Sequence, residues 1–474
     1  MIVTPFAAIA FLFGLILLFR GSVMGMFCLF ITATLFGGSA AFILVALGGS
    51  SIPPAQFVLM FVALRCLLPG PGQMETLRTA IWQNRFMLLF VLYGVVSAFT
   101  LPIVFANSMS VTPLRPIPGA DLFAVLPLRM SGQNVTTAVY MVGTLMAGIA
   151  ASAAMQRPGA ALTFARAGAW IGLTHALLGI SGVVLMGTAW DQFLALFRNG
   201  YYAQLNQSFD GLVRMNGIWP EPSGFAAYGS AWCVMMIELW LRNVLPRRTG
   251  PAGLVLLLAL IASTSSTAYV SLAAYALFAV LRFAVAPWNL PARKQLALIA
   301  VGLLGTVFVL SLLLLLPSLA LHLWKLLNLM TVEKAQSTSG IQRAFWAKQG
   351  LSAFLNSYGL GIGAGSFRSS SLLTAILGST GILGSLAFLA HLLRSVQPFT
   401  AEFLAMRLPS TERAVGCAAS TTALIMLIPA SLAAPSPDPG LMWGVMCGVA
   451  IALRPVRRAQ RPRPPQRVKR PAYG

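Results

Sequence analysis

Long apolar stretches, separated by short polar ones, recur along almost the whole chain. Each approaches the ~20 residues that cross a bilayer as a helix. They predict helical spans at about 2–19, 23–47, 53–68, 86–106, 135–155, 167–187, 223–241, 252–264, 266–283, 295–317, 371–393, 413–430 and 440–453. The pattern therefore predicts an all-α, polytopic integral membrane protein with about 12 to 14 transmembrane helices, 13 by this division, in a single membrane domain over residues 1–453.

The segment from Ala252 to Phe283 decides the orientation of everything after it. As one helix its 32 residues would be roughly 48 Å long, too long for a single ~30 Å crossing. A turn at Ser263–Ser266 would divide it into two short spans. A single span would instead reverse the later half of the chain and break the positive-inside rule.

Charge favours the turn. The chain carries 32 Lys and Arg against 10 Asp and Glu, a net charge of +22, with a mean hydropathy of +0.81. With the turn in place, more than two thirds of the cations lie inside, so we expect the N-terminus outside and the C-terminus inside. The basic, Pro-rich tail at 454–474 is expected to be disordered and cytoplasmic, along anionic headgroups. Cations placed in loops and a tail argue against a nucleic-acid partner.

The same topology puts the three longest interior loops, at about 107–134, 188–222 and 318–370, on the outer face, where we expect the chemistry. The third holds five cations, and four of them lie in or just before its second half: Lys334, Arg343, Lys348 and Arg368. Its run GLGIGAGS includes Gly363 and Gly365, and glycines let backbone N–H groups approach an anion closely. We interpret it as the floor of an anion site. The alternative is a flexible loop whose cations meet lipid headgroups.

The second outer loop ends in RMNGIWPEPSGFAAYGSAW, which supplies Arg214, Asn216, Trp219 and Glu221. Glu221 stands between two prolines, in a restricted backbone that suits a positioned general base. The alternative is a carboxylate favoured by the dipole of the helix that follows.

A polar cluster at the predicted turn includes Ser265 and Ser266, whose hydroxyl groups could bind sugar or phosphate oxygens. The alternative is that these hydroxyl groups satisfy backbone groups between packed helices. Glu238 and Arg242, four residues apart, are typical of a stabilising helical pair. His175 is a lone histidine within a span and a candidate functional group. The five cysteines and the outer carboxylates show no metal-ligand spacing, so we expect no metal site and no disulfide framework.

Five motifs occur in a characteristic order. They are NVTTAVYMVG (134–143), WPEPSGFAAY (219–228), SSTAYVSL (265–272), GLGIGAGSFRSS (359–370) and GSTGILGSLAF (378–388). Their order, with a long outer loop before the last two, resembles the O-antigen polymerase and O-antigen ligase superfamily of bacterial inner membranes, particularly its exopolysaccharide polymerase branch. The resemblance covers roughly residues 85 to 395.

The resemblance implies a glycosyltransferase that uses no cofactor, metal or nucleotide sugar. Its donor is a glycan on undecaprenyl pyrophosphate. The acceptor is the next lipid-linked repeat unit in a polymerase, or lipid A core in an O-antigen ligase. Ligases carry a histidine where this chain reads FRSSSLL (367–373), and an arginine where it has Thr267. Both departures favour the polymerase.

In this mechanism cations stabilise the leaving pyrophosphate, and Arg343 and Arg368 are the first candidates, followed by Arg214 and Lys348. Glu221 takes the proton of the acceptor hydroxyl. Trp219 and Trp346 stack on sugar faces or anchor the interface. Membrane lipids, a chain-length regulator and a flippase are the expected partners. The competing hypothesis is a flippase for lipid-linked oligosaccharides, which would concentrate polar residues at the membrane midplane.

Overall fold

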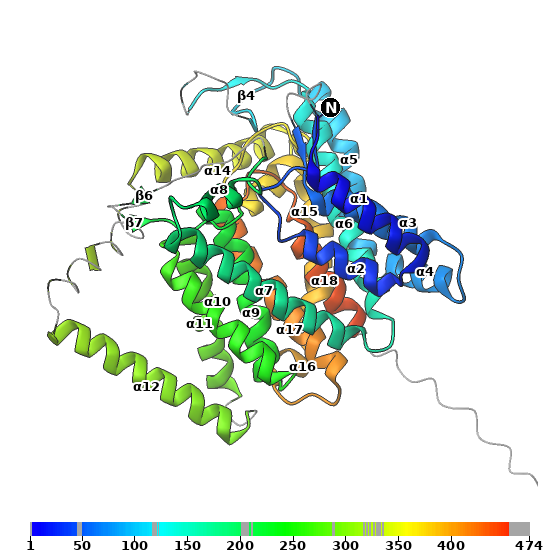
Figure 1. Cartoon of the computed structure of the whole chain (residues 1–474). Coiled ribbons are helices and arrows are strands. Elements are labelled where there is room, and N and C mark those ends of the chain that lie inside the picture. The colour runs from blue at the N-terminus through cyan, green and yellow to red at the C-terminus, as the bar shows by residue number, and fades with distance from the viewer. Residues whose placement is uncertain are drawn as a thin grey trace, which may run out of the picture.

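The structure is a computed structural model of the whole chain. It describes residues 2–44, 50–115, 121, 123–200, 208–209, 212–286, 290–315 and 336–454, with a few single positions between 318 and 333. The chain is mostly helical (Figure 1). Seven helices are long and apolar enough to cross a membrane, as in a multi-pass membrane protein: α5 (Arg85–Val104), α6 (Gly132–Met155), α7 (Ala160–Val184), α9 (Pro222–Leu241), α11 (Ser266–Val285), α15 (Leu372–Val396) and α17 (Thr411–Ala433).

Other helices fill the remaining predicted spans. The shorter apolar helices are α1 (Pro5–Arg20), α2 (Val23–Ala33), α3 (Pro54–Leu67) and α18 (Leu441–Leu453). Two further helices fall in predicted spans, α10 (Pro246–Ala262) and α12 (Ala292–Leu315). Each predicted span thus contains a helix, whereas the number of membrane crossings stays a prediction.

Loops and short connections carry the rest of the secondary structure. The helices are α4 (Gln73–Gln83), α8 (Ala189–Ala195), α14 (Thr338–Asn356) and α16 (Ala401–Leu404). The described strands form three small antiparallel sheets: β1 (Ile2–Val3), β2 (Phe42–Leu44) and β3 (Ser50–Ile52); β4 (Ser110–Val111) with β5 (Leu126–Pro127); and β6 (Ser208–Phe209) with β7 (Leu212–Val213).

Two predicted segments need correction, and one predicted turn is confirmed. The predicted helix at 23–47 ends at Ala33, because the chain then unwinds and pairs as β2. The predicted loop at 318–370 is not wholly a loop, since it contains α14. The predicted turn at Ser263–Ser266 is confirmed: α10 ends at Ala262, Thr264 has a left-handed backbone, and α11 begins at Ser266.

Small residues let the central helices approach closely. A Cβ atom on Gly448 of α18 would lie 2.2 Å from the carbonyl oxygen of Gly148 of α6, and one on Gly444 would lie 2.5 Å from that of Thr144. Backbones in van der Waals contact are the usual means of packing helices in a membrane. One buried cluster extends from Ala10 to Leu453, so the first and last helices share a core.

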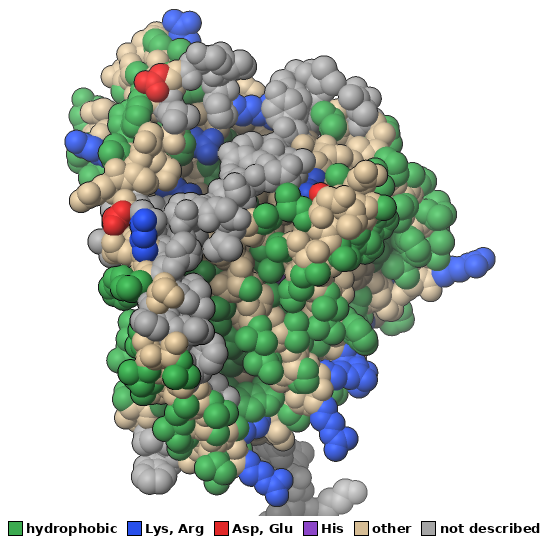
Figure 2. All heavy atoms as spheres, turned by 60° about the vertical axis from the view of Figure 1, so that its left-hand side comes forward, with side chains coloured by type: hydrophobic (Ala, Val, Ile, Leu, Met, Phe, Trp, Pro, Cys, Tyr) green, Lys and Arg blue, Asp and Glu red, His purple; other side chains and the backbone are tan. Residues whose placement is uncertain are grey.

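The helices end at two opposite faces. In Figure 1, α14, α8 and β4 lie at one end of the bundle and α16 lies at the other; we call these the α14 end and the α16 end. Figure 2 shows a face on which hydrophobic side chains cover the middle, with most Lys and Arg side chains toward its upper and lower ends. This distribution is typical of a membrane-spanning surface.

Cations at the α16 end cap the C-termini of helices. Basic side chains donate to the carbonyl oxygens at four helix C-termini: Arg65 to Gly21, Arg394 to Gln83, Lys294 to Leu241 and Arg454 to Val396. These positions carry partial negative charge, so a cation there stabilises the helix. Arg454 was predicted to begin a disordered tail, but it is 1% exposed. The rest of the predicted tail, 455–474, lies outside the described residues.

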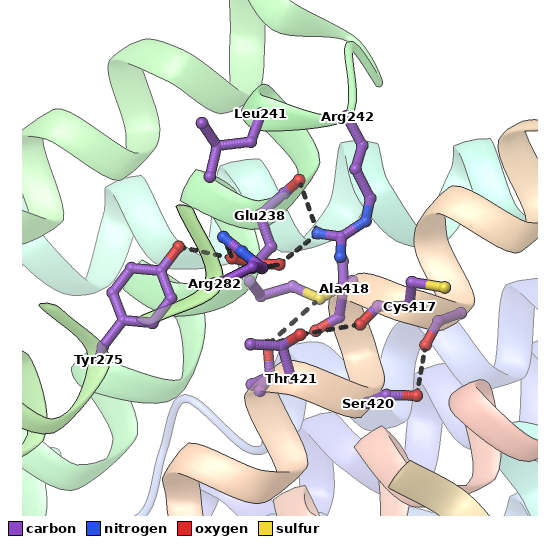
Figure 3. A network of polar contacts seen from close by, with 12 residues as sticks. Glu238, Leu241, Arg242, Tyr275, Arg282, Cys417, Ala418, Ser420 and Thr421 are labelled. Atoms are coloured by element: carbon purple, nitrogen blue, oxygen red, sulfur yellow. Dashed lines mark hydrogen bonds and ion pairs between the residues drawn. The ribbon is translucent and has the colours of Figure 1, made fainter. Parts of the chain in front are cut away.

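Glu238 lies at the centre of a buried ionic network near the α16 end (Figure 3). Its predicted pairing with Arg242 is confirmed, and Arg282 of α11 joins from 2.8 Å. Tyr275 donates its hydroxyl to the same carboxylate at 2.7 Å. The charged side chains are 0–1% exposed, so each depends on the others for its stabilisation.

Candidate functional site

A cavity of about 390 Å³ lies toward the α14 end of the bundle. Its walls come from the C-terminal ends of α2 and α17 and the N-terminal ends of α3, α9, α11 and α18. The lining includes Trp219, Glu221 and Thr267 and reaches down α9 to Tyr228, roughly 9 Å into the bundle at 1.5 Å per residue. Most of the lining is apolar, so the few polar groups determine what the cavity can do chemically.

Glu221 lies at the N-terminal boundary of α9, with an extended backbone and Pro222 as the first helical residue. Its side chain makes no capping hydrogen bond to the backbone of α9, although a carboxylate at this end of a helix is also favoured by the helix dipole, the alternative role considered for it. The side chain lines the cavity and accepts a hydrogen bond from Ser223 Oγ. The predicted rigid placement therefore directs a carboxylate into a largely apolar space.

Trp219 is half-buried and forms part of the cavity wall. Its ring centroid is 4.9 Å from that of Tyr228. A Cβ atom on Gly37 would lie 2.5 Å from the Trp219 ring, and one on Gly38 would lie 2.3 Å from the carbonyl oxygen of Ile218. The glycine pair thus lets the chain after α2 approach Trp219 and Ile218 closely.

Electrostatics link Arg214 to two other predicted site residues, Glu221 and Arg343. Burial lowers the pKa of Arg214, Glu221 opposes this shift, and the positive charge of Arg343 adds to it. Both charges are therefore within electrostatic range of Arg214, as is Tyr269 at the start of α11. The structure thus brings together three of the predicted site residues, from the second loop and from α14, which are far apart in sequence.

Arg368 and Trp346 form a second group beside the first. The guanidinium carbon of Arg368 lies 4.4 Å from the centroid of the Trp346 ring, and Arg368 Nη1 donates to the carbonyl oxygen of Leu114 at 3.2 Å. The adjacent N–H of Ser369 donates to Pro435, in the α17–α18 connection that contributes to the cavity wall. Trp346 lies one helical turn after Arg343 on α14, which links the two groups.

The glycine run, predicted as an anion-binding floor, packs closely against neighbouring backbone and uses two of its N–H groups within the protein. The N–H groups of Ile362 and Gly363 donate to the carbonyl oxygens of Gly378 and Ser379, at a break in α15. Gly363 and Gly365 are buried, with left-handed backbones. A Cβ atom would lie 2.6 Å from the Ser97 oxygen at Gly363 and 2.4 Å from the Gln133 oxygen at Gly365. Both glycines serve close packing.

The remaining predicted residues lie around these groups. Ser265 is fully buried and its Oγ has no hydrogen-bond partner among the described residues, whereas Thr267, from the same polar cluster, lines the cavity. Ser266 is half-buried in the first turn of α11. Asn216 is half-buried and its carbonyl oxygen accepts from Trp219 N–H at 2.8 Å. Lys348 is exposed on α14, and Lys334 lies outside the described residues.

Asp438, in the α17–α18 connection, was not predicted as a site residue. Its neighbours Pro439 and Gly440 line the cavity. The carboxylate accepts from Thr144 Oγ1 at 2.7 Å and from Gly440 N–H at 3.3 Å. Burial raises the pKa of Asp438 to about 6, against these two hydrogen bonds. A carboxyl group in this range can exist in either protonation state near neutral pH.

His175 packs beside the cavity wall instead of forming a catalytic pair. Its ring stacks on Phe225 with centroids 4.2 Å apart, and Nε2 lies 3.1 Å from the Phe225 carbonyl oxygen.

Gly37 and Gly38, which interrupt an apolar run, were the one sequence signal that the N-terminal helices reach the site. A glycine pair there marks a close backbone approach, but not its partner.

Within the described part of the chain, no three or more His, Cys, Asp or Glu residues come together in a way that could hold a metal ion. The site is therefore one carboxylate, two nearby cations and an aromatic wall around an apolar cavity.

The chain matches none of the protein-family models, curated proteins or solved structures with which it was compared.

Proposed function

We propose that this chain is a metal-independent glycosyltransferase that polymerises oligosaccharide repeat units carried on undecaprenyl pyrophosphate. It would act at the periplasmic face of a bacterial inner membrane and make exopolysaccharide or O-antigen. The observation that carries the proposal is the placement of Glu221 and Trp219 in the same cavity, with Arg214 and Arg343 nearby. The five-motif resemblance adds the substrate class.

Each part of the cavity corresponds to a requirement of glycan transfer. The acceptor hydroxyl oxygen bonds to the anomeric carbon of the donor sugar while the bond from that carbon to the pyrophosphate oxygen breaks. Glu221 receives the hydroxyl proton. Arg214 and Arg343 stabilise the negative charge that develops on the pyrophosphate, which guanidinium groups bind in a planar, bidentate geometry. The Trp219 ring supplies an apolar face against which a sugar can stack.

The position of the polar residues favours a transferase over a flippase. A flippase needs a polar path through the membrane, commonly near its midplane. Here Glu221, Arg214 and Arg343 gather toward one end of the bundle, and the one buried ionic network described near the other end, around Glu238, is internally paired. An O-antigen ligase is the runner-up, and FRSSSLL at 367–373 lacks the histidine that the resemblance associates with ligases.

The test is Glu221→Gln, a nearly isosteric change that removes the base. We expect the turnover rate to fall roughly 100- to 10,000-fold. Single repeat units should accumulate on their lipid carrier in the outer leaflet, where a membrane-impermeant probe detects them. Glu412→Gln, an exposed glutamate in the first turn of α17, is the matched control and should give normal polymer.

Two results would contradict the proposal. Lipid-linked units confined to the inner leaflet would mean that translocation is the failed step, as in a flippase. Polymer of normal length and amount from Glu221→Gln at matched protein level would remove Glu221 from the chemistry.

A further inference from the structure

A second cavity, of about 360 Å³, lies between α3, α5 and α6. It spans Val135 to Met146 on α6, roughly 16 Å at 1.5 Å per residue. The side chains around it are almost all apolar. Examples are Leu59 and Met60 on α3, Val95 and Phe99 on α5, and Val139 and Val142 on α6. We call it the α3–α6 groove.

The groove opens on the outside of the bundle. Met60 is 58% exposed and Val139 is 55% exposed. Both α5 and α6 are long and apolar enough to cross a membrane, so the opening faces lipid hydrocarbon. Since lipid tails are as apolar as the groove, the hydrophobic effect does not select one chain over another there. Selection has to come from polar groups beside the groove.

Such groups lie where α3 begins. Tyr140 lines the groove and donates its hydroxyl to the carbonyl oxygen of Ser51 at 3.0 Å, and Gln56 lines it as well. Arg115, just after β4, lies within electrostatic range of Tyr140, as does Asp438. A guanidinium group beside an apolar groove complements a lipid with a phosphate headgroup.

The groove shares a wall with the Glu221 cavity. Pro53 and Ala55, at the start of α3, line the Glu221 cavity, whereas Ile52 and Gln56 line the groove. The wall is therefore a single helical turn. A lipid whose chain lies in the groove and whose headgroup lies near Arg115 would present the group attached to its phosphate next to the Glu221 cavity.

We infer that the α3–α6 groove holds the isoprenoid chain of the donor, a polyprenyl pyrophosphate-linked glycan, with Arg115 at the phosphate that carries the chain, whereas Arg214 and Arg343 face the phosphate that carries the sugar. The inference rests on the proposed function for the substrate class. It adds a location for the lipid part of one substrate. It also gives the first turn of α3 the role of separating the lipid chain from the reacting sugar.

Photocrosslinking of the full chain tests the inference. Val139 is replaced by the photoreactive residue p-benzoylphenylalanine, and the protein is reconstituted in phosphatidylethanolamine and phosphatidylglycerol vesicles with undecaprenyl pyrophosphate as the probe. The matched control carries the same residue at Leu177, which is 52% exposed on α7, away from the groove. We expect the probe to crosslink at Val139 at least about 5-fold more than at Leu177, by mass spectrometry of the labelled peptide.

Two substitutions separate the chain from the headgroup. Val142→Trp fills the groove and should reduce the Val139 crosslink about 5-fold or more, whereas Leu177→Trp should leave it unchanged. Arg115→Gln should raise the concentration of undecaprenyl pyrophosphate needed for half-maximal crosslinking about 10-fold, because a charge-assisted contact is lost, and should not affect undecaprenol, which has no phosphate. Gel filtration and thermal unfolding establish that each variant is folded.

Three results would overturn the inference: equal crosslinking at Val139 and Leu177, phospholipid crosslinks at Val139 that undecaprenyl pyrophosphate does not displace, or crosslinks between two copies of the chain at Val139. The assay needs no turnover, so it fails independently of the proposed function. If Glu221→Gln blocks polymer formation but Val139 gives no specific crosslink, only the groove assignment is overturned. If Val139 crosslinks specifically but Glu221→Gln makes normal polymer, the proposed function is overturned and the groove keeps its ligand.

Discussion

Arg282 of α11 holds the carboxylate of Glu238 of α9 with two hydrogen bonds, of 2.9 and 2.8 Å. Arg242 reaches the same carboxylate from the other side (Figure 3). One buried anion thus serves two buried cations. Two helices that begin beside the candidate site are in this way fixed to each other near their opposite ends.

Glu238→Ala should destabilise the protein strongly, because it leaves two buried guanidinium groups without a counter-charge. We expect a loss of about 3 to 5 kcal/mol in the free energy of unfolding. The matched control is Glu402→Ala, which breaks the ion pair with Arg413. The side chains of this pair are 33% exposed at Glu402 and 28% exposed at Arg413, so the loss should cost about 1 kcal/mol or less. Thermal unfolding in detergent measures both. Equal shifts in Tm would contradict a special role for the buried network.

Asp438 should make stability depend on pH. Its pKa of about 6 in the folded protein lies above the ordinary value of 3.8, so the folded state binds the proton more tightly. The contribution of Asp438 to the free energy of unfolding therefore falls as the pH rises from about 4 to about 6. Asp438→Asn removes this dependence and should gain stability relative to wild type over that range. The gain should be at most about 3 kcal/mol, at about 1.4 kcal/mol per pKa unit.

The measurement is the Tm difference between Asp438→Asn and wild type at pH 4 and at pH 7.5. A second variant, Thr144→Val, removes the hydroxyl that donates to the ionised carboxylate. It should move the pH transition upward without abolishing it. A Tm difference that stays constant with pH would contradict the shifted pKa.

The sequence predicted helices better than contacts. Apolar length raised the question of whether α10 and α11 are separate, and the distribution of cations along the chain decided it. The four-residue spacing of Glu238 and Arg242 identified their pair, because that signal is local. The contact between Glu238 and Arg282 joins residues 44 positions apart and leaves no local pattern. The α2 prediction was wrong after Ala33, where the chain packs against Trp219 of a distant loop, a contact that likewise leaves no local pattern.

The candidate site was predicted in part. Glu221, Arg214 and Arg343 were chosen for their chemistry, and the fold brings their charges near one another. Glycines gave a less specific signal, because the same spacing suits anion binding and close backbone packing. Only the neighbouring atoms distinguish the two roles, and at Gly363 the neighbour is the carbonyl oxygen of Ser97.

Gly363→Ala tests the packing role directly. The new methyl group would meet the Ser97 oxygen at 2.6 Å, in a backbone conformation with φ of 97° that alanine rarely adopts. We expect a loss of about 1 to 3 kcal/mol in stability. Gly302→Ala in α12, where nothing lies within 4 Å of the added methyl group, is the control and should be neutral or slightly stabilising. Thermal unfolding compares them. An unchanged Tm for Gly363→Ala, with lost activity, would restore the anion-binding role.

Arg368→Lys should impair polymer formation nearly as much as Arg368→Ala. The guanidinium plane of Arg368 lies over the Trp346 ring, and its Nη1 reaches the Leu114 carbonyl. A lysine keeps the charge but supplies neither the planar stacking surface nor a fork that can hold two phosphate oxygens. If Arg368 contacts the leaving pyrophosphate, each variant should lose about 2 to 4 kcal/mol of transition-state stabilisation, or roughly 30- to 1,000-fold in rate.

The alternative is that Arg368 only joins α14 to the segment at Leu114. Trp346→Phe separates the two roles, because it keeps an aromatic face under the guanidinium group and leaves the charge in place. Under the pyrophosphate role it should lose far less activity than Arg368→Lys, whereas their Tm values should be similar. The rate of polymer formation and the Tm are measured at matched protein levels. Wild-type polymer yield from Arg368→Ala, together with a lowered Tm, would show that the side chain only stabilises the loop.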